Sequence, residues 1–327
     1  MRRFRHDLGE GEIAGVEFGD PVQPFAALWL HATGFNAMTY QSILAPLGLR
    51  ARVAALDMRG HGRTTLPADP KKLHSSWTRY RDDIIEWLDR YAPGGLVLGG
   101  HSMGGAVSLM VAGKRPDLVK GLVLIDPVIL SPHQYFWMHA FPPIGWAIRS
   151  SNAMIRQARK RRSDFGSVAE ARERYSGRGA FRSWRAPFLD DYLLDGLERT
   201  DHGPADSPEQ TWSLLCEPRW EAATFGAQRN RPWAALAKVR RKKIPITILR
   251  AETGSVLTDK VVEKLVRKVP ALILKRKRGS SHFLPMEVPY DVRDALSSYL
   301  SRLFEGFTVA EEGPVRRTLR VGERYGS

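Results

Sequence analysis

The chain has 327 residues, of which 43% are hydrophobic and 26% are charged. This length and hydrophobic content suit one large α/β domain or two smaller ones, and they exclude a chain that is disordered throughout. The formal net charge of +15 favours attraction to phosphates, anionic lipids or acidic partners. A single cysteine, Cys216, excludes an internal disulfide and any metal site built from several cysteines.

The excess positive charge is concentrated in short blocks. These blocks are residues 159–162, 240–243 and 275–278, and a C-terminal stretch with Arg316, Arg317, Arg320 and Arg324. No zinc-finger, helix-turn-helix or RNA-binding signature accompanies them, so we expect no specific nucleic-acid partner. The blocks are typical of a solvated basic surface, with weak contact to anionic surfaces as the alternative. The basic N-terminal residues lead into no apolar stretch, which predicts a soluble, cytoplasmic protein without a signal peptide or transmembrane helix.

The first part of the chain alternates between strand and helix patterns. Strands are predicted at 25–31, 52–57, 96–99 and 119–125, because each is a short apolar run that ends in polar or glycine residues. Helices are predicted at 76–91, with Ser76 as the N-cap, and at 103–113. This alternation predicts an α/β fold with a mostly parallel central sheet and helices on both faces.

The alternation stops after the sixth core strand, at about residue 127. Residues 127–243 are helical, aromatic and arginine-rich in pattern, and we expect them to form an inserted helical lid. Strands at 244–249 and 271–274 and helices at 258–268 and 289–304 then follow. The expected organisation is therefore a core made of residues 1–126 and 244–307, a lid at 127–243, and a basic C-terminal tail at 308–327.

Ser102 is the candidate nucleophile. It lies in Gly100-His101-Ser102-Met103-Gly104, between a predicted strand and a predicted helix. A Gly-x-Ser-x-Gly string is weak evidence alone, but a sharp strand-to-helix turn would lift the serine above the sheet. The flanking glycines remove Cβ atoms that would clash there. The N–H groups at the start of the helix would also face developing negative charge.

A serine hydroxyl needs a base and an orienting acid to act as a nucleophile at neutral pH. His282 follows the last predicted strand in a short polar loop and is the best candidate for the base. The acid should lie between Ser102 and His282 at the C-terminal end of a strand. Asp126 and Glu252 both satisfy this, and we favour Asp126, with Glu252 as the alternative.

The oxyanion needs its own hydrogen-bond donors. His31-Ala32-Thr33-Gly34-Phe35 forms a turn of mostly small residues at the end of the first apolar strand. We expect the backbone N–H groups of Thr33 and Met103 to supply the donors. Removing one such donor typically reduces the rate by about 10²- to 10³-fold.

Four segments in order resemble the α/β-hydrolase fold superfamily, over roughly residues 20 to 305. They are the turn that starts at His31, the segment Asp57-Met58-Arg59-Gly60-His61-Gly62, the Ser102 turn, and the loop at 279–285 that contains His282. The resemblance implies a serine hydrolase with an inserted lid domain. It also implies that Asp57, Arg59 and His61 form a structural loop, and that His101 is a supporting residue.

The chain departs from the family pattern at the acid. Many members carry an aspartate a few residues after the strand that corresponds to 244–249, where this chain has Gly254 and Ser255. Relatives that resemble haloalkane dehalogenases place the acid after the preceding strand, and Asp126 matches that position. Those enzymes use an aspartate nucleophile, so Ser102 argues against dehalogenation and epoxide opening and for acyl transfer to water.

The resulting hypothesis is a carboxylic-ester hydrolase that needs no metal and no cofactor. Aromatic residues at 135–146 are expected to form a lid wall over Ser102, which suits a small-molecule substrate with an apolar or aromatic acyl group. The alternative for these residues is that they form the lid's own core. A carbon–carbon bond hydrolase or a non-catalytic small-molecule-binding protein of the same fold remains open as an alternative function, and neither the substrate nor the oligomeric state follows from the sequence.

Overall fold

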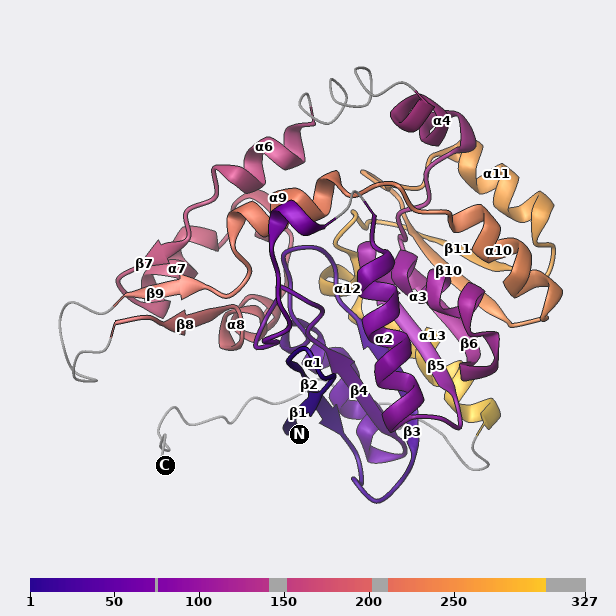
Figure 1. Ribbon diagram of the computed structural model, residues 1–327, viewed down its shortest axis with the longest axis horizontal. Coiled ribbons are helices and arrows are strands. Elements are labelled where there is room, and N and C mark those ends of the chain that lie inside the picture. The colour runs from indigo at the N-terminus through magenta and orange to yellow at the C-terminus, as the bar shows by residue number, and fades with distance from the viewer. Residues whose placement is uncertain (74–75, 141–151, 202–210, 304–327) are drawn as a thin grey trace.

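An eight-stranded sheet forms the centre of the molecule (Figure 1). The structure is a computed structural model that describes residues 1–73, 76–140, 152–201 and 211–303. Side chains are described for all of these residues except 137–140. Its spatial order is β1-β2-β4-β3-β5-β6-β10-β11. The strands are β1 (Arg2–Asp7), β2 (Glu12–Phe18), β3 (Phe25–Leu30), β4 (Arg52–Leu56), β5 (Leu96–His101), β6 (Val119–Ile125), β10 (Ile246–Ala251) and β11 (Ile273–Lys277).

The six strands from β4 to β11 are parallel to their neighbours, whereas β2 pairs antiparallel with both β1 and β4. Strands β3 and β5 are buried along their whole length, as expected for a parallel sheet covered on both faces. The carboxyl ends of the parallel strands therefore meet at one edge of the sheet, and the loops that follow them can form a common site.

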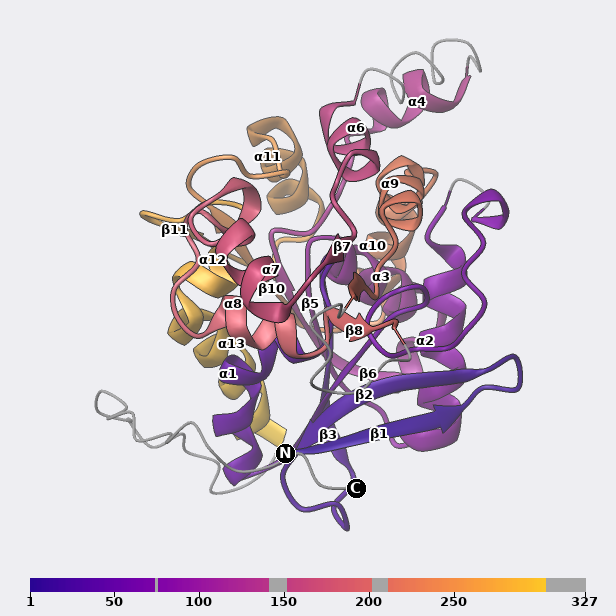
Figure 2. The same cartoon turned by 90° about the vertical axis from the view of Figure 1, so that its left-hand side faces the viewer.

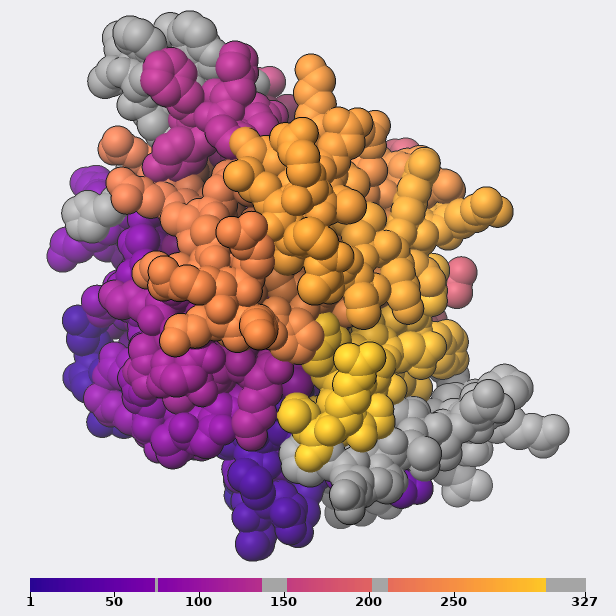
Figure 3. All heavy atoms as spheres, turned by 90° about the vertical axis from the view of Figure 1, so that its right-hand side faces the viewer, coloured from indigo at the N-terminus to yellow at the C-terminus, as the bar shows by residue number. Residues whose placement is uncertain are grey.

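Helices cover both faces of the sheet. One core cluster contains residues of α2 (Thr78–Tyr91), α3 (Met103–Lys114), α10 (Pro232–Arg241) and α11 (Asp259–Lys268). The other contains residues of α1 (Gln41–Leu44) and α13 (Pro289–Leu303). Figure 3 shows the outer surface of the first layer, where the orange segment that includes α10 and α11 lies against the magenta segment of α3. The predicted α/β-hydrolase fold, with its mostly parallel sheet and two helical layers, is confirmed.

Residues between β6 and β10 form α4 (Pro132–Ala140), α6 (Ala153–Arg159), α7 (Val168–Tyr175), α8 (Phe188–Leu194), α9 (Pro218–Gly226) and α10. They also form a small antiparallel sheet in the order β7-β9-β8, from β7 (Asp164–Phe165), β8 (Leu197–Arg199) and β9 (Trp212–Leu214). The sequence predicted helices alone here. Strands of two or three residues are too short to show a period-two pattern, which explains the difference.

Several element boundaries also differ from the predictions. The hairpin of β1 and β2 was not predicted, because β1 is an exposed edge strand rich in charged residues, a common way of protecting a sheet edge (Figure 2). For the same reason β11 extends to Lys277, beyond the predicted 271–274. Helix α2 begins at Thr78 after Trp77, so Ser76 is not its N-cap. Thr258, by contrast, caps α11 by accepting from the N–H of Val261.

No helix within 1–73, 76–140, 152–201 or 211–303 is both long enough and apolar enough to cross a membrane. The predicted basic tail at 308–327 lies outside the described residues.

Candidate active site

Ser102 lies at the sharp turn between β5 and α3. Its backbone has φ 54° and ψ −113°, a conformation that L residues rarely adopt. The turn needs glycines around it, because a Cβ at Gly104 would lie 2.1 Å from the carbonyl oxygen of Leu30, and one at Gly100 would lie 2.4 Å from the backbone of Gly104. The strained turn and the close approach of α3 to the sheet together present the Ser102 side chain above the strand ends.

His282 contacts Ser102 directly. Its Nε2 lies 3.0 Å from Oγ of Ser102, and its Nδ1 lies 2.7 Å from Oδ2 of Asp126. Since the carboxylate accepts the Nδ1 proton, Nε2 is left free to accept the hydroxyl proton of Ser102. The sequence places these three residues 24 and 156 positions apart, and the ends of β5 and β6 and the loop after β11 bring them together.

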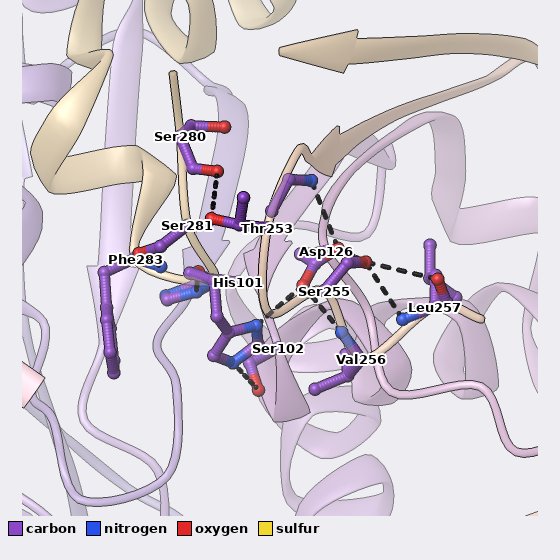
Figure 4. A network of polar contacts seen from close by, with 12 residues as sticks. His101, Ser102, Asp126, Thr253, Ser255, Val256, Leu257, Ser280, Ser281 and Phe283 are labelled. Atoms are coloured by element: carbon purple, nitrogen blue, oxygen red, sulfur yellow. Dashed lines mark hydrogen bonds and ion pairs between the residues drawn. The ribbon is translucent and has the colours of Figure 1, made fainter. Parts of the chain in front are cut away.

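Asp126 is fully buried, at the end of β6. Burial raises the pKa of its carboxyl, but the hydrogen bonds from His282, Ser255 and the Val256 N–H outweigh this effect and leave the pKa below its usual value. Figure 4 shows Ser255 and Val256 on one side of this carboxylate. The surroundings therefore keep Asp126 ionised at neutral pH, as an orienting acid requires.

Glu252, the alternative acid, lies away from the histidine. Its Oε2 accepts from the N–H of Gly279 at 2.8 Å, and its Oε1 lies 3.6 Å from Arg276. Arg250, two residues before Glu252, pairs with Asp259 at 2.6 Å. Sequence position could not separate the two carboxylates, since both follow strands of the same parallel sheet.

Ser255 is a site residue that the sequence analysis did not assign. It occupies the segment where many family members carry the acid, and its hydroxyl donates to Oδ1 of Asp126 at 2.5 Å. The hydroxyl oxygen of Ser255 also accepts from the N–H of Leu257 at 3.1 Å (Figure 4). The absence of an aspartate from this segment could have identified Ser255, because a side chain at this position contacts Asp126 at the end of the neighbouring strand.

Thr33 and Met103, the candidate oxyanion residues, are adjacent in space. The Thr33 hydroxyl donates to Sδ of Met103 at 3.4 Å, and Thr33 lines the same cavity as Ser102. Met103 is the first residue of α3, and the first turn of that helix closes with the bond from the Ala106 N–H to the Ser102 carbonyl. Met103 precedes Ala106, whose N–H makes this first bond, so no hydrogen bond within the helix uses the N–H of Met103.

A buried chain of hydrogen bonds connects the Thr33 loop to the backbone of His282. The N–H of Ala32 donates to the Tyr40 hydroxyl at 3.1 Å, and this hydroxyl lies 2.9 Å from Nδ1 of His101. Nε2 of His101 then donates to the carbonyl oxygen of His282 at 2.8 Å. Burial and the nearby His282 lower the pKa of His101 to about 3, so the ring is neutral and Nδ1 accepts from Tyr40.

The loop from Asp57 to Gly62 has structural contacts, as the resemblance implies. Asp57 accepts from the N–H groups of Ala37 and Arg63 at 2.7 and 2.9 Å, and burial raises its pKa to about 7. Arg59 forms a buried ion pair with Asp83 at 2.7 Å. The bond from Ala37 connects this loop to the residues that follow the Thr33 turn.

A cavity of about 300 Å³ opens beside Ser102 and His282. Its apolar lining includes Phe35, Trp77, Val128, Leu130, Phe225 and Phe283. The predicted aromatic wall at 135–146 does not supply this lining within the described residues, since neither Tyr135 nor Phe136 lines the cavity and Phe136 is 54% exposed. The side chains of 137–146 lie outside the described part of the chain.

The described residues include no group of three or more His, Cys, Asp or Glu side chains that could hold a metal ion. The site is instead a serine, a histidine and a carboxylate beside an apolar cavity. This arrangement can transfer a proton from Ser102 to His282 and hold the protonated ring against Asp126.

The profile of the alpha/beta hydrolase family matches residues 27–295 of this chain. Among curated proteins, the chain is 33% identical over 99 residues to 2-(acetamidomethylene)succinate hydrolase of Mesorhizobium japonicum, covering 30% of this chain and 34% of that protein. It is also 33% identical over 106 residues to monoglyceride lipase of Mus musculus, covering 31% and 34%. The chain therefore aligns with about a third of the length of these relatives.

Solved structures resemble a much larger share of the chain. A crystal structure of E-2-(acetamidomethylene)succinate hydrolase superimposes with a TM-score of 0.71 at 21% identity, covering 92% of this chain and 99% of that one. A thioesterase domain from the curacin biosynthetic pathway superimposes with a TM-score of 0.66 at 18% identity, covering 90% and 98%. At these sequence identities the superpositions show only that the folds are similar, whereas the family profile matches most of the sequence. The chain belongs to the alpha/beta hydrolase family.

Proposed function

We propose that the protein is a serine hydrolase that cleaves a carboxylic ester or a related acyl bond through an acyl-enzyme on Ser102. The observation that carries this proposal is the continuous contact from Ser102 Oγ to His282 Nε2 and from His282 Nδ1 to Asp126 Oδ2, at 3.0 and 2.7 Å. Family membership supports a hydrolase, and so do the relatives named above, a monoglyceride lipase and a 2-(acetamidomethylene)succinate hydrolase.

In the first half of the reaction, Oγ of Ser102 attacks the substrate's carbonyl carbon while its proton moves to Nε2 of His282. The ionised Asp126 stabilises the imidazolium and keeps its second proton on Nδ1. The N–H groups of Thr33 and Met103 donate to the carbonyl oxygen as it becomes an oxyanion. His282 then gives the proton to the leaving alcohol, whose bond to the acyl carbon breaks and leaves the acyl group on Ser102.

In the second half, a water molecule takes the place of the alcohol. His282 accepts one proton from this water as its oxygen attacks the acyl carbon, and the same two N–H groups hold the second oxyanion. Collapse of this intermediate breaks the bond to Oγ, and the proton on Nε2 returns to Ser102. The products are the alcohol and the carboxylic acid, and no redox partner or cofactor enters the cycle.

The cavity lining supports a substrate with an apolar acyl or aromatic group. Phe35, Phe225 and Phe283 lie within reach of the same space as Ser102. Because this lining comes from both the core and the segment between β6 and β10, we propose that this segment covers the site as a lid.

The decisive experiment is labelling with a fluorophosphonate, which reacts with activated serines, followed by mass spectrometry of the adduct. We expect one adduct, on Ser102, and none in Ser102→Ala. A panel of p-nitrophenyl esters of increasing chain length should be hydrolysed by the wild type, with kcat reduced by at least about 10³-fold in Ser102→Ala. A folded wild-type protein that is neither labelled nor active on esters would instead be a binding protein of the same fold.

A further inference from the structure

Arg161 and Glu221 form a buried ion pair next to the candidate active site. Nη1 of Arg161 lies 3.0 Å from Oε2 of Glu221, and the two side chains are only 16% and 10% exposed. Arg161 also donates to the hydroxyls of Tyr192 at 2.6 Å and Tyr175 at 3.3 Å. Arg161 belongs to the basic block at 159–162 that the sequence predicted to be solvated. That prediction is wrong for Arg161, because these partners enclose its guanidinium.

Glu221 reaches the loop that carries Thr33. A Cβ at Gly34 would lie 2.4 Å from Oε1 of Glu221, so this position, with φ +78°, has room for the carboxylate only because it is glycine. Glu221 lines the cavity together with Ser102, Thr33 and His282. Glu221 therefore borders both the cavity and Gly34, the residue that follows the proposed oxyanion donor.

The two oxygens of Glu221 have different surroundings. Oε2 is paired with Arg161, whereas Oε1 accepts no hydrogen bond from any residue in the described parts of the chain. Among the described residues that line the cavity, Glu221 is the one with a carboxylate, and none is a lysine or an arginine. Arg161 lies behind it and is not part of the lining. A ligand in the cavity thus meets the carboxylate first and the guanidinium only at longer range.

The ion pair also answers a difficulty of this placement. A lone carboxylate beside an oxyanion site would repel the negative charge that develops on the substrate oxygen. Arg161 offsets part of the charge of Glu221 through the ion pair at 3.0 Å. The guanidinium thus weakens the repulsion at the oxyanion site, whereas a substrate group that contacts Oε1 directly meets the oxygen that Arg161 does not pair with.

We propose that Glu221, held by Arg161, is a specificity-determining residue that selects acyl substrates with a hydrogen-bond donor, neutral or cationic, and rejects substrates that carry a carboxylate near the scissile bond. A hydroxyl, amide or ammonium group can donate to Oε1. A carboxylate would instead face Oε1 in a confined space that screens charge poorly, and Arg161, already paired, offers it no compensation. This inference rests on the proposed ester hydrolysis at Ser102.

The test compares three p-nitrophenyl esters, with the enzyme-free rate subtracted: the butanoate, its cationic isostere the 3-aminopropanoate, and the anionic glutarate monoester. We expect the wild type to hydrolyse the glutarate monoester with a kcat/KM at least tenfold below that of the butanoate, and the 3-aminopropanoate at least as well as the butanoate. In Glu221→Gln, Arg161 loses its counter-charge. The ratio of glutarate to butanoate should then rise at least tenfold, and the preference for the cationic ester should be lost.

Glu217→Gln is the matched control, because Glu217 is exposed and lies just before α9, one helical turn from Glu221. We expect it to keep the wild-type ratios. Equal ratios in the wild type and in folded Glu221→Gln would overturn the inference while leaving ester hydrolysis intact.

A binding measurement keeps the inference testable if no ester is hydrolysed or if Glu221→Gln does not fold. Calorimetric titration of the wild type with n-pentylammonium and with pentanoate needs neither turnover nor a variant. We expect the cation to bind at least tenfold more tightly. Equal affinities, or tighter binding of pentanoate, would overturn the charge selection. If the cation binds more tightly but the protein neither hydrolyses esters nor reacts with the fluorophosphonate, only the proposed function would be contradicted.

Discussion

Ser255 donates a hydrogen bond of 2.5 Å from its hydroxyl to Oδ1 of Asp126, and this bond joins the ends of the neighbouring strands β6 and β10. Oδ2 of the same carboxylate contacts His282, so Ser255 supports the side of Asp126 that the histidine does not use. The segment in which many relatives carry the acid thus contacts Asp126, the carboxylate that pairs with His282.

This relationship predicts how the acid can be moved. In Ser255→Asp, two carboxylates share one buried space, so one must take up a proton, and we expect kcat to fall at least about tenfold at pH 7. In the double variant Asp126→Asn/Ser255→Asp, the repulsion is gone and the carboxylate occupies the alternative position. Its kcat should exceed that of Asp126→Asn alone. Steady-state kinetics of the three variants test this, and a double variant no better than Asp126→Asn counts against it.

Asp126→Asn should reduce kcat by about 10²- to 10⁴-fold, because an amide in place of the carboxylate favours the wrong tautomer of His282 and cannot stabilise its protonated form. Glu252→Gln should stay within about twofold of the wild type, since Glu252 contacts Gly279 and Arg276 and not the histidine. Steady-state kinetics distinguish the two variants, with circular dichroism to confirm that both are folded. A large loss in Glu252→Gln with little in Asp126→Asn would reverse the assignment.

Tyr40→Phe removes the hydroxyl between the Ala32 N–H and Nδ1 of His101. Two buried groups lose a partner, so we expect the free energy of unfolding to fall by about 1–3 kcal/mol. We also expect kcat to fall several-fold with little change in KM, because the loop that carries Thr33 loses a fixed position. Tyr80→Phe is the matched control, since Tyr80 is equally buried but its hydroxyl contacts Thr224. A kcat loss of the same size in both variants would assign the effect to stability alone.

The low pKa of His101 predicts a specific acid sensitivity. In the folded protein burial lowers this pKa to about 3, from its ordinary value of 6.5. The unfolded state therefore binds one more proton at His101 between these two values, and folding stability from this group is lost as the pH falls through that window. At pH 4.5 the loss relative to pH 7 should be about 2–3 kcal/mol.

His101→Gln removes this titration, although it also costs stability at pH 7 because its contacts to Tyr40 and the His282 carbonyl change. Urea denaturation at pH 7 and pH 4.5 should show that the wild type loses about 2–3 kcal/mol more than the variant between the two pH values. Parallel losses in both proteins would mean that His101 is protonated in the folded state.

Gly104→Ala should be severely destabilising. The new Cβ would lie 2.1 Å from the carbonyl oxygen of Leu30, and both groups belong to backbone that cannot move without separating α3 from β3. We expect a loss of about 3 kcal/mol or more. Gly94→Ala is the control, because nothing lies within 4 Å of its added Cβ, and its effect should stay within about 1 kcal/mol. Thermal or urea unfolding measures the stability of both variants. Similar stabilities would contradict the close packing of α3 against β3 at the Ser102 turn.

The sequence by itself determined the α/β fold, the parallel strands at 25–31, 52–57, 96–99 and 119–125, and the position of Ser102 at a strand-to-helix turn. These features depend on local patterns, namely short apolar runs and the glycines around the Ser102 turn. It also reduced the acid to two carboxylates, because the rule that residues at strand ends converge applies to Asp126 and Glu252 alike.

Only the tertiary structure shows that Asp126, and not Glu252, contacts His282. The choice depends on how the end of β6 lies relative to the loop after β11, a distance that no local pattern contains. The contact of Ser255 with Asp126 and the hydrogen bonds through Tyr40 and His101 also appear only in the tertiary structure. The sequence predicts a solvated charge at Arg161, but in the structure Arg161 pairs with Glu221, which is 60 residues away in the chain. Pairing across the chain, rather than residue type, sets the charge and the proton positions of this site.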